Sequence, residues 1–304
     1  MSYRRVIILD GGMGRELERR GAPFKQPEWS ALAMMEAPEV VKEVHKDFIR
    51  SGAKVITTNS YALVPFHIGE KRFHDRGRAL AASAGQIARA AVEETRADAL
   101  IAASIPPLFG SYRADLFQPD RVTEIATPLI EELSSYIDLW LCETQSLLAE
   151  AMSVKTLIDS LDEQKKPVWT SFTLEDSELT REPLLRSGEP LTEAVQAVSE
   201  TGIDAILFNC CQPEVIGDAI QVTRNTLTSL NALGIAIGAY ANAFPPQPKN
   251  ATANEGLDEI RTDLTPAAYL NWAQQWRKQG ATLIGGCCGV GPEHIALLTK
   301  KLTI

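Results

Sequence analysis

Eight short runs of almost continuously apolar residues recur along the whole chain, each about as long as a β-strand. A strand of a parallel sheet is buried on both faces, so it lacks the apolar–polar alternation of a half-exposed strand. The pattern therefore predicts eight buried parallel strands. They are expected at Val6–Leu9, Lys54–Thr57, Ala99–Ser104, Leu139–Cys142, Val168–Phe172, Ala205–Asn209, Ile235–Ala239 and Leu283–Gly285.

Segments with helical spacing separate these runs. In Pro38–Ile49 the apolar residues share one face and the charged residues fall mostly on the opposite face, which is typical of an amphipathic helix. Comparable helices are expected at Gly77–Glu94, Thr123–Ser135, Leu147–Leu161, Leu191–Glu200, Glu214–Ala232, Pro266–Gln279 and Pro292–Leu302. Strand and helix thus alternate eight times.

This alternation in 304 residues, without a linker or a shift in composition, predicts an α/β fold. We expect a closed (β/α)8 TIM barrel that forms a single domain over residues 1–304, and an open doubly wound sheet is the structural alternative. In a barrel the carboxyl ends of all strands surround one mouth, and function sits on the loops that follow them. Three long segments, Ile105–Asp120, Glu175–Pro190 and Tyr240–Thr265, follow predicted strands and are candidate binding loops or lids.

Composition narrows the classes of partner. The formal net charge is −9, whereas a binder of phosphate backbones needs clustered Lys and Arg, so nucleic acid is not an expected partner. No apolar run is long enough to cross a bilayer, and the apolar stretch near the start is too short for a signal peptide. The five cysteines are expected to be reduced thiols of a cytoplasmic protein, which could be an oligomer.

The placement of the cysteines points to a metal. Cys210 directly follows the sixth predicted strand, in ILFNCC, and Cys287 with Cys288 directly follows the eighth, in LIGGCCG. Catalytic zinc sites use three protein ligands and leave a fourth position open. Glycines 285, 286 and 289 let the backbone bend so that two successive side chains can face one ion, which a regular strand forbids. Three thiolates at one mouth would fit such a site.

Other interpretations of the same residues stay open. Free cysteine is often a small core residue, and this is the expected role of Cys142, whereas Cys211 is a neighbour, a spare ligand or core. Thiol redox chemistry or metal-dependent hydrolysis would be less typical, because C-x-x-C spacing and His ligands are missing from the motif. None of the histidines shows ligand spacing, and we expect packing or surface roles for them: His45 and His294 on helices, His67 and His74 in a loop.

Motifs along essentially the whole chain resemble the homocysteine S-methyltransferase family, which includes betaine-homocysteine methyltransferases and the homocysteine module of methionine synthases. They are LDGGMGRELERRG, IRSGAKVITTNSY, SIPPLFGSYRADL, LCETQSLLAEA, SGEPLTEAV, ILFNCC and LIGGCCGVGPEHI. The resemblance implies that Cys210, Cys287 and Cys288 bind Zn²⁺. Cys211, the Gly-Val that follows GGCC, and the long charged stretch 175–190 depart from the family pattern.

The resemblance also implies an activity, the zinc-dependent transfer of a methyl group to the thiol of homocysteine to give methionine. S-methylmethionine, S-adenosylmethionine and betaine all present a cationic methyl donor. Zinc deprotonates a thiol that it coordinates, so no catalytic group beyond the substrate thiol is expected. Another thiol or selenol as acceptor, or a non-catalytic structural zinc site with Cys211 as fourth ligand, are the alternatives.

Residues that contact substrate are expected at the strand ends. The resemblance places Asp10, Gly11 and Glu143 at the amino-acid part of homocysteine, with Gly12 letting the backbone approach closely; capping of the next helix is the other role for Asp10. Asn59 could bind substrate or tie a loop. An aromatic ring can hold the cationic donor. The candidates are Tyr61, Phe109, Tyr112 and Trp169, the last more typical of core packing.

Overall fold

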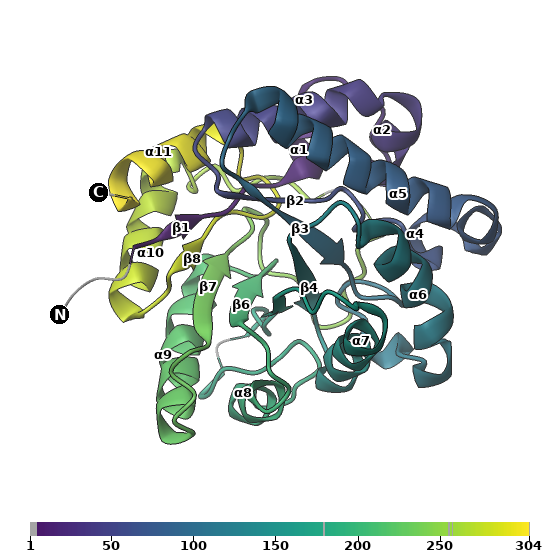
Figure 1. The fold of residues 1–304 in the computed structure, drawn as a ribbon. Helices are drawn as coiled ribbons and strands as arrows, with labels where there is room; N and C mark the ends of the chain where they lie inside the picture. Colours follow the sequence, from purple (N-terminus) through teal and green to yellow (C-terminus); the bar gives the residue numbers. More distant parts are fainter. Residues whose placement is uncertain (1–4, 179, 255, 257, 304) are drawn as a thin grey trace.

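Eight parallel strands form one sheet in the computed structural model, which describes residues 5–178, 180–254, 256 and 258–303. The strand order is β1-β8-β7-β6-β5-β4-β3-β2, and a bridge between Leu9 and Val55 links the two end strands, so that the sheet curls into a barrel (Figure 1). The strands are β1 Ile7–Ile8, β2 Val55–Thr57, β3 Leu100–Ile105, β4 Leu139–Gln145, β5 Val168–Phe172, β6 Ala205–Asn209, β7 Ala236–Tyr240 and β8 Leu283–Ile284. The (β/α)8 barrel is thereby confirmed over an open doubly wound sheet.

Helices cover the outside of this barrel (Figure 1). The α-helices are α1 Met13–Arg19, α2 Ser30–Glu36, α3 Pro38–Arg50, α4 Pro65–Ile68, α5 Glu70–Thr95, α6 Val122–Leu133, α7 Leu148–Leu161, α8 Leu191–Ser199, α9 Pro213–Ser229, α10 Pro266–Gln279 and α11 Pro292–Leu302. Two short 3₁₀ helices, η1 Ala114–Leu116 and η2 Pro119–Arg121, lie in the loop after β3. In the described part of the chain, none of the helices combines the length and the apolar character needed to cross a bilayer.

The core has two layers, and this explains why the strand sequences are apolar throughout. Side chains such as Leu141, Trp169 and Leu207 fill the inside of the barrel. Their neighbours on the same strands, such as Cys142 and Phe208, pack outward against the helices. Each strand buries both faces, so both sets of alternating residues are apolar.

The structure corrects the expected element list in the segments without an apolar stripe. α1, α2 and α4 were not expected because, with seven residues or fewer, they are too short to show a helical period. α5 begins at Glu70, before the expected Gly77, because its first two turns are mostly charged. His67 therefore lies in α4 and His74 in α5, so the loop expected for both histidines was wrong.

Candidate metal and substrate site

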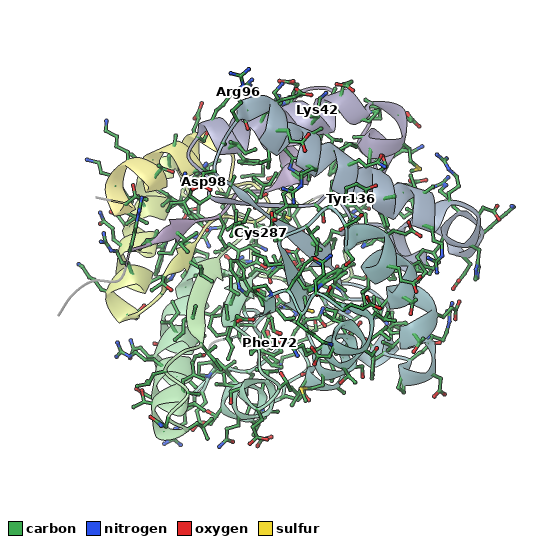
Figure 2. The ribbon with its side chains drawn as sticks, in the orientation of Figure 1. Lys42, Arg96, Asp98, Tyr136, Phe172 and Cys287 are labelled. Atoms are coloured by element: carbon green, nitrogen blue, oxygen red, sulfur yellow. The ribbon has the colours of Figure 1, made fainter. Side chains whose placement is uncertain are left out.

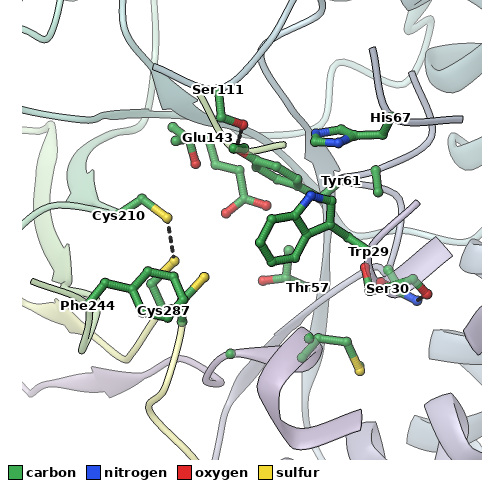
Figure 3. A pocket seen from close by; sticks show the side chains of 18 of the residues that line it. Trp29, Ser30, Thr57, Tyr61, His67, Ser111, Glu143, Cys210, Phe244 and Cys287 are labelled. Atoms are coloured by element: carbon green, nitrogen blue, oxygen red, sulfur yellow. Dashed lines mark hydrogen bonds between the residues drawn. The ribbon is translucent and has the colours of Figure 1, made fainter. Parts of the chain in front are cut away.

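Three of the five cysteines meet at the mouth of the barrel. The Sγ atoms of Cys210, Cys287 and Cys288 all lie within 4.8 Å of one another, and the Cys210 and Cys287 sulfurs are 3.0 Å apart (Figure 3). Cys210 follows the last residue of β6, and the Cys287–Cys288 pair follows β8. Figure 2 places Cys287 toward the middle of the ring, far from surface residues such as Lys42. Residues 77 positions apart are thus brought to one point.

The backbone at both sulfur-bearing loops departs from strand geometry. Cys210 has φ of 53°, in the left-handed region that residues other than glycine and asparagine seldom adopt. Gly289, directly after the second cysteine pair, has φ of 81°. A Cβ atom at Gly286 would lie 2.0 Å from a Val290 side-chain carbon, and one at Gly12 would lie 2.5 Å from the Cys287 carbonyl oxygen. These glycines allow the β1 and β8 loops to pack directly on each other.

The three thiols share hydrogen bonds, so that one has a lowered pKa while the pKa values of Cys210 and Cys287 are raised. The pKa of Cys288 is held well below its usual range, because the Cys210 and Cys287 thiols donate hydrogen bonds to its sulfur. The pKa of Cys210 is raised, since ionisation would cost those hydrogen bonds. Zinc–thiolate bonds of about 2.3 Å in a tetrahedron require sulfurs about 3.8 Å apart. The Cys210 and Cys287 sulfurs, 3.0 Å apart, would have to separate by less than 1 Å to reach that spacing, and all three sulfurs already lie within 4.8 Å of one another, so the three residues fit a metal ion.

The other two cysteines take no part in this cluster. Cys142 and Cys211 are fully buried in the layer between barrel and helices. Among the described residues, the cysteine group that could hold a metal contains Cys210, Cys287 and Cys288 and leaves Cys211 out. Burial raises the pKa of both excluded thiols, that of Cys142 to about 12. Cys211 is therefore a core residue, and the cluster contains three sulfurs.

Two buried carboxyl groups face the same mouth. Asp10 accepts hydrogen bonds from the backbone N–H of Thr57 at 2.7 Å and from its hydroxyl at 3.1 Å, and it does not cap α1. Glu143 accepts hydrogen bonds from Ser104 and, at 3.2 Å, from the Tyr240 hydroxyl. Burial raises the pKa of Asp10 to about 8 and that of Glu143 to about 7. No cationic side chain pairs with either group among the described ion pairs, so the site can accept a cationic ligand.

A single cavity of roughly 1160 Å³, including its open mouth, joins the sulfur cluster to the carboxyl groups. The described loops after β1, β2, β3 and β7 all contribute to its wall. A ligand in this cavity can therefore reach the sulfur cluster and the two carboxyl groups at the same time.

The aromatic part of the wall differs from the expectation. Tyr61 and Tyr112 line the cavity, whereas Phe109 packs against Phe117 in the outer core and Trp169 lies inside the barrel. The sequence analysis missed five other aromatic residues that line the cavity: Tyr240 at the end of β7, and Phe24, Trp29, His67 and Phe244. The last four lie on loops and short helices without periodicity, so the sequence carried no signal for them.

The remaining expected contact residues also line the cavity, but several already have partners. Asn59 donates to the Ser30 carbonyl oxygen at 3.1 Å, and the Tyr61 hydroxyl lies 2.6 Å from that of Ser111. Gly12 lines the cavity and donates its backbone N–H to the Val290 carbonyl oxygen at 2.9 Å. A Cβ atom at Gly11 would lie 2.2 Å from the Val290 carbonyl oxygen. Close loop packing accounts for both glycines.

The loop after β7 covers the cavity and is held in place by polar contacts on two sides. On one side, Asn254 accepts a hydrogen bond from the Trp29 indole at 3.0 Å and lies 3.2 Å from His67. On the other side, the buried Arg186 pairs with Asp176 at 2.7 Å and donates to the Gln247 carbonyl oxygen. The described residues of the charged segment 175–190 thus line no part of the cavity, and Arg186 holds the loop that covers it.

Comparisons with known proteins agree with this geometry. The family model described as homocysteine S-methyltransferase matches residues 7–302. A homocysteine S-methyltransferase of Escherichia coli is 31% identical, covering 97% of this chain and 95% of the relative, and a selenocysteine methyltransferase of Astragalus bisulcatus is 27% identical, covering 98% and 93%. The crystal structure of the E. coli homocysteine methyltransferase MmuM in its metallated form superposes with a TM-score of 0.75 at 29% identity, covering 98% of this chain and 96% of that one.

Proposed function

Because the chain belongs to the homocysteine S-methyltransferase family, we propose that it transfers a methyl group from a cationic donor to the thiol of homocysteine, giving methionine. The whole chain would act as one homocysteine-binding barrel domain. The observation that carries this proposal is the meeting of three sulfurs and two unpaired buried carboxyl groups in one cavity. The metallated E. coli relative supports a metal at the sulfurs.

We assign the metal position to Cys210, Cys287 and Cys288, and the ion to zinc, whose preference for thiolate ligands fits a set of three sulfurs. Bound zinc would supply one thing, a substrate sulfur that is deprotonated at neutral pH and remains nucleophilic. Cys211 faces away from the cluster, so a closed four-sulfur structural site is disfavoured and a position is left for the acceptor.

The carboxyl groups would hold the other end of the acceptor. Asp10 and Glu143 line the same cavity as the sulfurs, and each lacks a cationic partner in the described structure. The ammonium group of an amino acid would supply that partner and return both carboxyl groups to their ionised form. Binding at two ends would fix the direction in which the acceptor sulfur points.

The donor would occupy the aromatic half of the cavity. Trp29, Tyr61 and Phe244 line it, and aromatic faces attract sulfonium or quaternary ammonium groups. In the transfer, the acceptor sulfur forms a bond to the methyl carbon while the bond from that carbon to the donor atom breaks and its electron pair stays on the donor. The donor loses its positive charge in this step, so a cavity that excludes water favours it.

A donor panel tests the proposal. Protein loaded with zinc is incubated with L-homocysteine and S-methylmethionine, S-adenosylmethionine or betaine, and methionine is quantified by mass spectrometry. We expect methionine with at least one of these donors. A parallel arm with selenocysteine as acceptor tests the selenol alternative. Selenocysteine is chosen because the chain is similar to the selenocysteine methyltransferase of Astragalus bisulcatus. Absence of a methylated product in every arm would contradict the proposal.

The raised pKa values predict how binding of the acceptor end depends on pH. In the ligand-free protein Asp10 and Glu143 take up protons below about pH 8 and pH 7, and these protons must leave when an ammonium group binds. Affinity for L-methionine, whose thioether releases no proton, should therefore fall about tenfold or more between pH 8 and pH 6. Isothermal titration calorimetry at several pH values measures it. Affinity that is independent of pH would place the ammonium elsewhere.

Trp29 should act on the donor alone. Its ring lines the cavity and meets Phe24 edge-on, with ring centroids 5.6 Å apart. Trp29→Leu removes the aromatic face and should raise the KM of the donor about tenfold, the equivalent of a cation–π interaction shielded from water. Trp29→Phe should keep most of the donor affinity. Steady-state kinetics with each substrate varied in turn would reveal an equal rise in the KM of homocysteine, which would remove Trp29 from the donor site.

A further inference from the structure

A strained residue follows Glu143 on β4. Pairing between β4 and β5 shifts register between Cys142 and Gln145, so that Glu143 and Thr144 together oppose one residue of β5. Such a β-bulge re-aims side chains. Thr144 has φ of 57°, and a β-branched residue in the left-handed region is a genuine outlier. Both Glu143 and Thr144 line the cavity, which two successive residues of a regular strand cannot do.

The Asn209 side chain forms hydrogen bonds with both the backbone and the hydroxyl of Thr144. The Asn209 Oδ1 accepts hydrogen bonds from the Thr144 N–H at 2.9 Å and from the Ser171 hydroxyl at 2.7 Å. The Asn209 Nδ2 donates to the Thr144 hydroxyl at 2.8 Å. Asn209 is completely buried, so water cannot replace these bonds. The side chain therefore ties together the ends of β4, β5 and β6.

We propose that Asn209 is a positioning residue for the acceptor: it holds Thr144 in the left-handed conformation, and the bulge that results keeps Glu143 aimed into the cavity. The role of Glu143 in this inference rests on the proposed function. Without the Asn209 side chain, Thr144 would relax toward an ordinary conformation and carry the adjacent Glu143 with it. The sulfur cluster would keep its metal, because the loops after β6 and β8 carry the ligands.

Glycine at position 144 should compensate for loss of the Asn209 side chain, because glycine adopts a positive φ without hydrogen bonds that hold it there. Asn209→Ala should raise the KM of homocysteine about tenfold at full metal content, because Glu143 would no longer be held in position for the ammonium group. Asn209→Ala with Thr144→Gly should come within about threefold of Thr144→Gly alone. Asn209→Ala with Thr144→Ala, which removes the same side chain but keeps the strain, should not recover.

The matched control is Asn242→Ala. Asn242 is equally buried and bonds Gln212 in the loop after β6, so Thr144→Gly should not rescue it. Failure of the glycine rescue, or loss of metal from Asn209→Ala as assayed by mass spectrometry of bound metal, would overturn the inference. The second result would mean that Asn209 acts on Cys210 instead of Thr144.

Thermal unfolding of the same variants measures, without any substrate, how much the hydrogen bonds between Asn209 and Thr144 stabilise the protein. Asn209→Ala should lower the melting temperature about 2 to 4 °C more with alanine at position 144 than with glycine. Equal losses would overturn the inference whatever the kinetics show. If wild-type protein fails to methylate homocysteine while this difference in melting temperature appears, the proposed function is wrong but Asn209 still holds Thr144 in its left-handed conformation.

Discussion

Replacing Cys287 by serine is expected to remove the metal and the methyl-transfer activity together, while the barrel stays folded. The Cys287 sulfur lies 3.0 Å from that of Cys210 and belongs to the three-sulfur cluster. A hydroxyl is a far weaker zinc ligand than a thiolate, and without the ion only a few per cent of the acceptor is thiolate at pH 7. Activity should fall on the order of 10³-fold. Bound metal is measured by plasma mass spectrometry and folding by circular dichroism.

Cys211→Ala is the matched control, because Cys211 is a buried neighbour of Cys210 that lies outside the cluster. It should keep about one metal ion per chain and near-normal activity, with a modest loss of stability from the small cavity. If Cys287→Ser turned over normally, or if Cys211→Ala lost its metal, the ligand assignment would be wrong.

Glu143→Gln is expected to abolish most acceptor binding without loss of metal. The carboxyl group of Glu143 is buried, accepts hydrogen bonds from Ser104 and Tyr240, and has no cationic partner in the described structure. An amide of the same shape cannot neutralise a buried ammonium group, and removing one partner of such a pair is strongly destabilising. The KM of homocysteine should rise about 10²-fold or more. Kinetics with homocysteine varied, together with metal analysis, would measure both effects.

A second buried carboxyl group controls for loss of charge alone. Glu150 lies on α7, burial raises its pKa to about 7, and it accepts a hydrogen bond from the Leu108 N–H outside the cavity wall. Glu150→Gln should leave the KM of homocysteine unchanged. An unchanged KM in Glu143→Gln, or an equal rise in both variants, would contradict the assignment of Glu143 to the substrate ammonium.

The sequence predicted the barrel well because burial on both faces leaves a direct mark in the chain. All eight expected runs contain the observed strands or overlap them, and the long amphipathic helices lie within a few residues of their expected places. The prediction missed α1, α2 and α4, which have seven residues or fewer, and the first turns of α5, where charged residues dominate. Hydrophobic periodicity cannot report such helices.

The residues of the site also fall into those that the sequence could predict and those that it could not. Cys210, Cys287 and Cys288 could be assigned before the structure, because each follows a predicted strand and a barrel brings strand ends together. The left-handed φ of Cys210, which accompanies the turn of its side chain into the mouth and that of Cys211 into the core, has no sequence signal in a residue other than glycine. The cavity wall from Phe24, Trp29 and Phe244 depends on how loops fold over the mouth, which a local pattern does not encode.

The central claim is that three sulfurs hold one ion and leave a position for the sulfur of the acceptor. X-ray absorption at the zinc edge counts the sulfur neighbours of the metal directly, at about 2.3 Å. Protein without substrate should show three sulfurs and one lighter atom, and addition of L-homocysteine should raise the count to four sulfurs. Four sulfurs before substrate is added, or a count that homocysteine leaves unchanged, would contradict the account.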